Sequence, residues 1–251
     1  MTLSNLRNNA PYLTAFLLFV LCLITISSFT SCKKDCFTKG SGPIVNQVFS
    51  VAEFNSVHLG VEGIVHVTQG PVQHLEVNGQ QNILDRLSLK VKNGNLDIGF
   101  ENYCGTTSYQ TLEIYVTIPS VKALRISGSG TIETTNTVAT DILNLDISGS
   151  GNISASVTTQ SVIARISGSG NMNLSGTAIH SDVSISGSGN FFAFGLLTNS
   201  TEIDISGSGD AEVSVSDSLD VEINGSGNVR YKGQPVINSS LSGSGRIEHV
   251  G

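Results

Sequence analysis

Residues 143–174 read LNLDISGSGNISASVTTQSVIARISGSGNMNL, and this stretch contains two copies of the motif that decides the fold. The motif recurs every 18–21 residues through the second half of the chain. Its seven copies, counting INGSG and LSGSG, begin at Ile126, Ile147, Ile166, Ile185, Ile205, Ile223 and Leu241. A flexible Gly/Ser linker has no reason to recur so regularly with apolar residues between its copies, whereas solenoid coils do. Each interval is therefore interpreted as one coil.

Apolar and polar residues alternate on both sides of each motif. Leu145, Ile147 and Ile153 share one parity, and the residues between them are Asn, Asp, Ser or Gly. A period of two indicates a strand with one buried and one wet face. Both glycines of a copy, such as Gly149 and Gly151, fall on the inward parity. Either the strand runs straight through them or the chain turns a corner there, and closing so short a coil favours the corner.

One coil cannot bury its own apolar face. Coils stacked about 4.8 Å apart pair their backbones as parallel strands and enclose a shared narrow core. The fold class predicted is all-β, a right-handed single-stranded parallel β-helix with an irregular N-terminal β section. The handedness follows from the rule for crossovers between parallel strands.

The first part of this β region lacks the repeat. Residues 89–100 predict a hairpin, because Asn93-Gly94 suits a tight I′ turn, and LEIYVTIP at 112–119 predicts a strand. We expect a single β-helix domain over 43–251, with irregular early coils or a cap over 43–122 and regular SGSG coils over 123–251.

The first residues predict export. The segment from Tyr12 to Phe29 carries no charge and follows Arg7, which indicates a signal peptide over 1–31. FTSC at 29–32 resembles the lipobox of bacterial lipoproteins, which implies lipidation of Cys32. A tether over 32–42 is expected to follow. Lys33 directly after Cys32 indicates an outer-membrane location, by resemblance to lipoprotein sorting. A cleaved secreted chain and a membrane-spanning helix remain alternatives.

The remaining cysteines do not form a framework. Cys22 lies inside the apolar segment and leaves with the signal, so Cys36 and Cys104 are left. In an oxidising envelope these two could pair, but two thiols alone do not establish a disulfide.

Charge and motifs exclude several function classes. The chain has 13 Lys and Arg against 20 Asp and Glu, a net charge of -7 without any basic run, so nucleic acid is excluded as a partner. The five histidines show no metal-ligand spacing, although His58 and His66 could meet across strands. Only Asp210 follows a GSG copy as a carboxylate, too few for calcium. No catalytic residue, metal or cofactor is predicted, and the protein is not expected to be an enzyme.

The sequence also resembles a known family. Four of the GSG copies are followed by asparagine, at Asn152, Asn171, Asn190 and Asn228, whereas Thr131, Asp210 and Arg246 depart from this pattern. With the lipobox-like start and the strand before the first copy, these signatures resemble the putative auto-transporter adhesin head GIN domain family of Bacteroidetes, from about Phe49 onward. The resemblance implies a β-helix at the bacterial envelope and carries over no catalytic residues.

These observations support a lipid-anchored envelope solenoid that acts as a non-catalytic structural or adhesive module. Ladders of Ser, Thr and Asn, with possible contacts at Asn152, Asn171, Asn190 and Asn228, would meet a glycan or a surface protein. A polysaccharide-active β-helix enzyme is one alternative, although Asp146 and Asp204 are expected about 14 Å apart, too far for a glycosidase pair. An envelope signalling or assembly scaffold is another, and the oligomeric state stays open.

Overall fold

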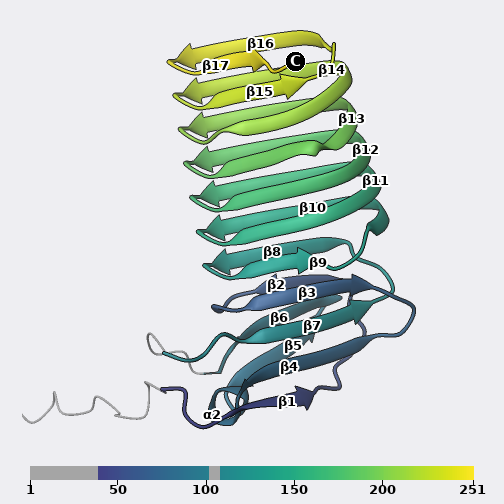
Figure 1. Ribbon diagram of the computed structural model, residues 1–251, viewed down its shortest axis with the longest axis vertical. Coiled ribbons are helices and arrows are strands. Elements are labelled where there is room, and N and C mark those ends of the chain that lie inside the picture. The colour runs from purple at the N-terminus through teal and green to yellow at the C-terminus, as the bar shows by residue number, and fades with distance from the viewer. Residues whose placement is uncertain (1–38, 102–107) are drawn as a thin grey trace, which may run out of the picture.

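A computed structural model describes residues 39–101 and 108–251 of the chain. The predicted signal peptide, Cys22, the lipidation site Cys32, Cys36, Cys104 and most of the tether lie outside the described residues. Within the described ranges the molecule is a column of stacked strands, with the N-terminal section at one end and the C-terminus at the other (Figure 1). None of the helices in those ranges is long and apolar enough to cross a membrane.

The regular coils begin at residue 123. Their strands are β8 (Ala123–Gly128), β9 (Thr131–Thr134), β10 (Val138–Gly149), β11 (Asn152–Gly168), β12 (Asn171–Gly187), β13 (Asn190–Gly207), β14 (Ala211–Gly225), β15 (Asn228–Lys232), β16 (Val236–Gly243) and β17 (Arg246–His249). Each strand pairs in parallel with the strand one coil away, as β11 does with β12. The predicted all-β parallel β-helix is confirmed.

Equivalent residues of successive coils lie directly on one another. The register aligns the first residue of all seven motifs, from Ile126 through Ile147 and Ile166 to Leu241. The six isoleucines in this file are at most 1% exposed. Because each coil supplies one apolar face, the shared spine of these side chains is the core that holds the column together.

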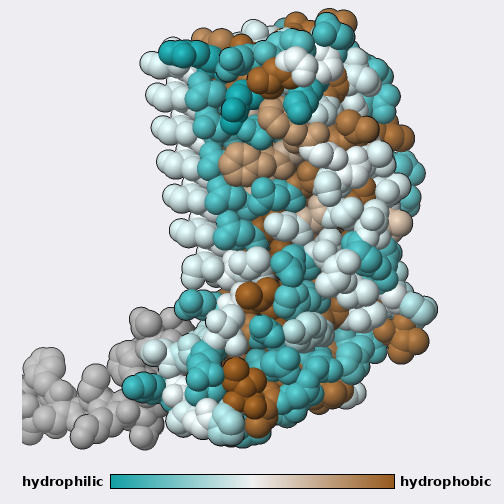
Figure 2. Space-filling model, viewed as in Figure 1, coloured by the Kyte–Doolittle hydropathy of each residue, from teal (hydrophilic) through white to brown (hydrophobic). Residues whose placement is uncertain are grey.

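The SGSG motif forms the corner between two sides of the column, visible as the evenly spaced pale edge in Figure 2. The expectation that both glycines face inward is wrong for the first of each pair. The first glycines adopt φ between 122° and 148° and are partly or fully exposed, whereas the second glycines are buried except in the last copy, where Gly245 is half-buried. The positive φ turns the chain at the first glycine, which interrupts the alternation that the parity argument assumed.

Neither corner position has room for a side chain. A Cβ on Gly168 would lie 2.4 Å from the Gly149 carbonyl oxygen of the adjacent coil. A Cβ on Gly170 would lie 2.3 Å from the Gly151 oxygen and 2.6 Å from Cγ2 of Ile147. Stacking at β-sheet spacing therefore demands glycine at both positions.

The N-terminal section contains β1 (Ile44–Val48), β2 (Ser56–Leu59), β3 (Ile64–Gln69), β4 (His74–Gln80), α2 (Gln81–Leu84), β5 (Leu87–Lys92), β6 (Asn95–Phe100) and β7 (Glu113–Ile118). The predicted hairpin and strand are confirmed as β5–β6 and β7, and Asn93 and Gly94 have φ of 52° and 74°. Antiparallel pairs β1–β4 and β4–β7 make this section irregular, as expected.

Strands of this section do not stack in chain order. β2 pairs in parallel with both β6 and β8, and β3 pairs in parallel with both β7 and β9. The coil made by β2 and β3 therefore lies between the later β6–β7 coil and the first regular coil (Figure 1). This arrangement brings together, on one surface, side chains that are separated by 39 and by 69 positions in the sequence.

Candidate functional site

The asparagines that follow the corners form a vertical file at the start of one side of the column. Asn171 Nδ2 donates to Asn152 Oδ1 at 3.1 Å, and Asn190 Nδ2 donates to Asn171 Oδ1 at 2.9 Å. We call the file made by Asn152, Asn171, Asn190, Asp210 and Asn228 the amide ladder. Its side chains are half-buried.

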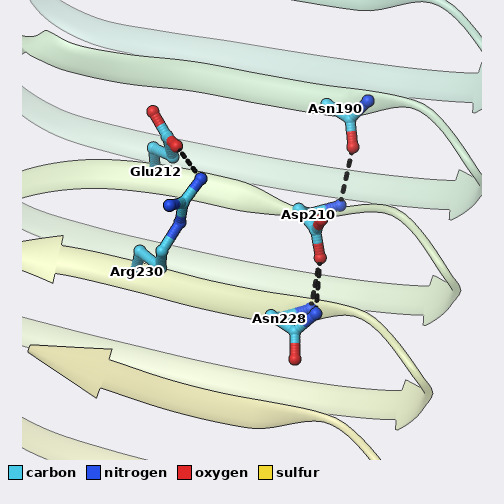
Figure 3. A network of polar contacts seen from close by, with 5 residues as sticks. All are labelled: Asn190, Asp210, Glu212, Asn228 and Arg230. Carbon is cyan, nitrogen blue, oxygen red and sulfur yellow. Dashed lines mark hydrogen bonds and ion pairs between the residues drawn. The ribbon is translucent and has the colours of Figure 1, made fainter.

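Asp210 occupies one rung of the amide ladder without breaking it (Figure 3). A carboxylate has no proton to donate, and instead the backbone N–H of Asp210 donates to Asn190 Oδ1 at 3.1 Å. Its carboxylate accepts both the backbone N–H and Nδ2 of Asn228, each at 2.8 Å. The sequence reasoning placed these side chains in one file correctly but did not foresee that they bond one another.

A second outward file lies two residues further along each strand. The register aligns Glu133, Ser154, Asn173, Phe192, Glu212, Arg230 and Glu248. Arg230 forms an ion pair with Glu212 beside the amide ladder (Figure 3). Phe192 is the one aromatic member of this file.

A polar hollow of about 610 Å³ opens around this second file. Its lining includes Ser154, Asn173, Phe192, Phe194 and Glu212. Two aromatic rings thus lie beside a hydroxyl, an amide and a carboxylate. An apolar surface with a few hydrogen-bonding groups around it is the usual composition of a small-ligand site.

A bulge in β13 creates a second depression. The register runs from Ala193–Val213 to Leu197–Ser214, so three residues of β13 between them have no partner in β14. Phe194 lies in this bulge, with Lys232 Nζ 4.6 Å from its ring centroid. Bulges redirect side chains in this way and are frequent near functional sites.

The bulge borders an apolar groove of about 770 Å³. Its lining includes Thr177, Ile179, Phe194, Leu197 and Lys232. Leu197 is 61% exposed and Ile179 58% exposed, and together they make an exposed apolar patch on the neighbouring strands β13 and β12. The polar hollow and the apolar groove share Phe194, so they form one continuous candidate binding surface.

One rim of the apolar groove carries an anion. Asp217 accepts hydrogen bonds from Ser216 Oγ at 2.5 Å and from Asn199 Nδ2 at 3.1 Å, and both donors line the groove. The Ser216 hydroxyl first, and then the Asn199 amide, lower the pKa of the Asp217 carboxyl from its usual value, because both stabilise the charged form.

Sequence reasoning missed both depressions. Two signals in the sequence point to them. Phe192 stands at an outward position where the other coils carry polar or charged residues, Phe194 follows two residues later, and the motif interval falls from 20 to 18 residues after Ile205. The longer coil must accommodate extra residues against a shorter neighbour, and the bulge results.

The histidines do not form a metal site within the described ranges, where no group of three His, Cys, Asp or Glu side chains could hold an ion. His58 and His66 each pair with a carboxylate instead. His58 Nδ1 lies 2.7 Å from Asp97 Oδ1, and His66 Nδ1 lies 2.7 Å from Glu133 Oε1.

Comparison with known proteins gives one family and several similar structures. A family model described as putative auto-transporter adhesin, head GIN domain, matches residues 53–235.

Among solved structures, the chain is 26% identical to a putative adhesin from Bacteroides fragilis NCTC 9343. The alignment covers 84% of this chain and 99% of that one, with a TM-score of 0.79. A putative adhesin from Parabacteroides distasonis ATCC 8503 is 25% identical, with coverages of 85% and 100% and a TM-score of 0.70. A putative lipid binding protein from the same organism shares the fold at 22% identity, coverages of 86% and 100%, and a TM-score of 0.72. No curated protein matches the chain.

Proposed function

Because the chain belongs to the family of putative auto-transporter adhesins with a head GIN domain, we propose that it is an adhesive module of the cell envelope that binds glycans. Binding, rather than catalysis, is its principal role. A lipid on Cys32 holds the column to the outer membrane, and the side bearing the amide ladder meets the ligand. The family and the β-solenoid support an adhesive or structural role.

One observation carries the choice of ligand. Phe192 interrupts a file of hydroxyl, amide and charged side chains, and it lies in the polar hollow between Asn173 and Glu212 in register. A sugar ring has apolar faces and a polar perimeter. An aromatic ring with amide and carboxylate groups beside it is complementary to both.

The amide ladder supports this contact from the neighbouring file. Its hydrogen bonds between coils hold Asn152, Asn171, Asn190 and Asn228 in fixed orientations. By the donor count of an amide, each Nδ2 group retains a second hydrogen for a ligand. A polymer lying along the column would meet an amide at three successive coils, those of Asn152, Asn171 and Asn190, about 4.8 Å apart, and again at Asn228.

A glycan array tests the proposal. The wild-type chain should bind a set of envelope or host polysaccharides, and Phe192→Ala should weaken that binding at least about tenfold, as expected when about 1.4 kcal/mol of stacking is lost. Ile142→Ala is the matched control, because Ile142 is 50% exposed and lines neither depression. Absence of binding to every polysaccharide, or equal binding by Phe192→Ala and wild type, contradicts the proposal.

Contact with another surface protein at the apolar groove is a second candidate, favoured by the exposure of Leu197 and Ile179. Leu197→Asp should then reduce adhesion to whole cells while glycan-array signals persist. Equal cell adhesion by Leu197→Asp and wild type contradicts this candidate.

The anchor has a separate test. Mass spectrometry of the mature N-terminus should find a lipidated Cys32, and Cys32→Ala should release the protein from the outer-membrane fraction. An unmodified N-terminus or unchanged membrane retention of Cys32→Ala contradicts the anchor.

A further inference from the structure

Three side chains on neighbouring strands form a continuous hydrogen-bonded line on the other side of the corner. Asp97 on β6 accepts from His58 Nδ1 on β2 at 2.7 Å, and His58 Nε2 lies 2.8 Å from Ser127 Oγ on β8. Strand pairing explains the alignment, since His58 is in register with Asp97 on one side and with Arg125, two residues before Ser127, on the other. The line therefore rests on the sheet itself.

The arrangement selects one histidine tautomer. A carboxylate has only acceptors, so the Nδ1 that faces Asp97 carries the proton and Nε2 presents its lone pair to the Ser127 hydroxyl. Asn95 Nδ2 also donates to Asp97 Oδ1 at 3.1 Å, which fixes the carboxylate. Hydroxyl, imidazole and carboxylate in this order are the requirements for an activated serine nucleophile, recognised by geometry on any fold.

The repeat shows that Ser127 differs from its equivalents. Ser148, Ser167, Ser186 and Ser206 occupy the same place in later coils. In the coil before each of these four serines, the position of His58 is taken by Arg125, Asp146, Arg165 and Ser184, in that order. Only Ser127 among these serines has an imidazole one coil away, so its environment is not a consequence of the repeat.

A backbone donor is also free beside Ser127. At the later corners the middle serine N–H donates to a glycine carbonyl one coil away, as Ser150 does to Gly128 at 2.9 Å and Ser169 to Gly149 at 2.9 Å. At the first corner, Ser129 N–H has no hydrogen-bond acceptor among the residues that the structure describes. The Ser129 N–H, two residues after Ser127, is thus a backbone donor that stacking does not use.

We propose that Ser127 is a nucleophile that accepts acyl groups from carboxylic esters, with His58 as general base and acid and Asp97 as a positioning residue. The Ser127 Oγ–carbon bond forms while His58 Nε2 takes the hydroxyl proton. The carbon–oxygen bond to the alcohol then breaks, and His58 returns the proton to the leaving alcohol. Water attacks the acyl-serine with His58 again as base, which releases the carboxylic acid and regenerates Ser127.

The surroundings indicate the substrate class. Ser127 is exposed, and the side chains of His58 and Asp97 are 32% and 50% exposed. None of the three lines the polar hollow or the apolar groove. An open site of this kind suits a small acyl ester carried on an accessible alcohol or polymer rather than a long acyl chain, which would need a pocket. The inference goes beyond adhesion and does not depend on glycan binding.

Labelling with an alkyl fluorophosphonate, mapped by peptide mass spectrometry, tests the nucleophile. Ser127 should be modified at least about 100-fold faster than Ser148, the lower end of what a positioned base contributes. Ser127→Ala should abolish the adduct and Ser148→Ala should leave it unchanged. His58→Gln should slow labelling by a similar factor. No adduct at Ser127, or equal modification of Ser127 and Ser148, overturns the proposal.

Cysteine variants give a measurement that does not depend on ester chemistry. Ser127→Cys should react with iodoacetamide faster at neutral pH than the double variant Ser127→Cys/His58→Gln, because only the imidazole favours the thiolate at this position. Adding Asp97→Asn to Ser127→Cys should reduce this reactivity, and Asp97→Glu should restore part of it. Equal thiol reactivity with and without His58, in variants with the wild-type circular dichroism spectrum, also overturns the proposal.

Discussion

Alanine at the corner glycines separates backbone strain from steric exclusion. Gly187 has φ of 123°, and a Cβ there would lie 2.5 Å from the Gly168 carbonyl oxygen, a backbone atom that cannot rotate away. The conformation costs a residue with a side chain about 1–3 kcal/mol, and forcing the coils apart adds about 1–3 kcal/mol. Gly187→Ala should therefore destabilise the protein by about 4 kcal/mol.

The column contains its own control for this substitution. Gly128 has φ of 138° but is the first corner of the stack, and nothing lies within 4 Å of a Cβ built there. Gly128→Ala should show only the strain, about 1–3 kcal/mol. Gly99, which has neither a positive φ nor any atom within 4 Å of a Cβ, should tolerate alanine with a change below about 0.5 kcal/mol.

Thermal and urea unfolding measure the difference. About 4 kcal/mol corresponds to a fall in Tm of about 8–16 °C for a domain of this size, against about 2–12 °C for Gly128→Ala. The urea midpoint should fall in the same order. If Gly187→Ala is no more destabilising than Gly128→Ala, then contact between stacked corners is not what requires glycine.

Three further predictions follow from burial, charge and strand pairing. Ile166→Ala should cost about 2–5 kcal/mol in urea unfolding, because Ile166 is 1% exposed, whereas Ile142→Ala should cost below about 0.5 kcal/mol. Hydrogen bonds from the Asn46 amide and then from His74 lower the pKa of Glu76 from 4.5. The stability that the Glu76 carboxylate contributes is therefore present above pH 4.5 and is lost as the pH falls through the folded-state pKa. Glu76→Gln should make Tm fall less in acid than it does for the wild type. In hydrogen exchange, amides of β16 should exchange faster than those of β12. All of β16 is exposed and, among the described strands, its one parallel partner is β14, whereas β12 is paired with both β11 and β13.

The regular half of the column could be predicted from short-range pattern. Alternation of apolar and polar residues assigns each side chain to a face, and a constant motif interval sets the coil length. These two properties are local, so they survive without coordinates, and the isoleucine file matches them residue by residue. Whether each corner glycine faces inward or outward was not predictable in the same way, because residues alternate between the two faces only while the strand continues.

Strand order in the first section depends on contacts that no local pattern contains. β2 and β3 have the same alternation as β6 and β7, so nothing in their own residues states which strand lies above and which below. The structure inserts β2 between β6 and β8. Pairing of this kind is decided by which arrangement buries the apolar faces of all these strands together.

The candidate sites also differ in whether a local pattern could predict them. Spacing from the corner placed the four asparagines of the amide ladder in one file, since every coil repeats the same position. The line of Asp97, His58 and Ser127 joins residues from three strands, and the bulge at Phe194 arises where a longer coil meets a shorter one.

The amino-acid sequence by itself determined the coil: its length, its two faces, its glycine corners and the stacking that a half-apolar strand requires. Tertiary structure alone decided which irregular strand lies against the first regular coil, and hence which side chains from distant segments meet. The physical reason is that periodicity specifies the shape of one turn, whereas proximity between segments is settled only when all the turns bury their apolar faces together.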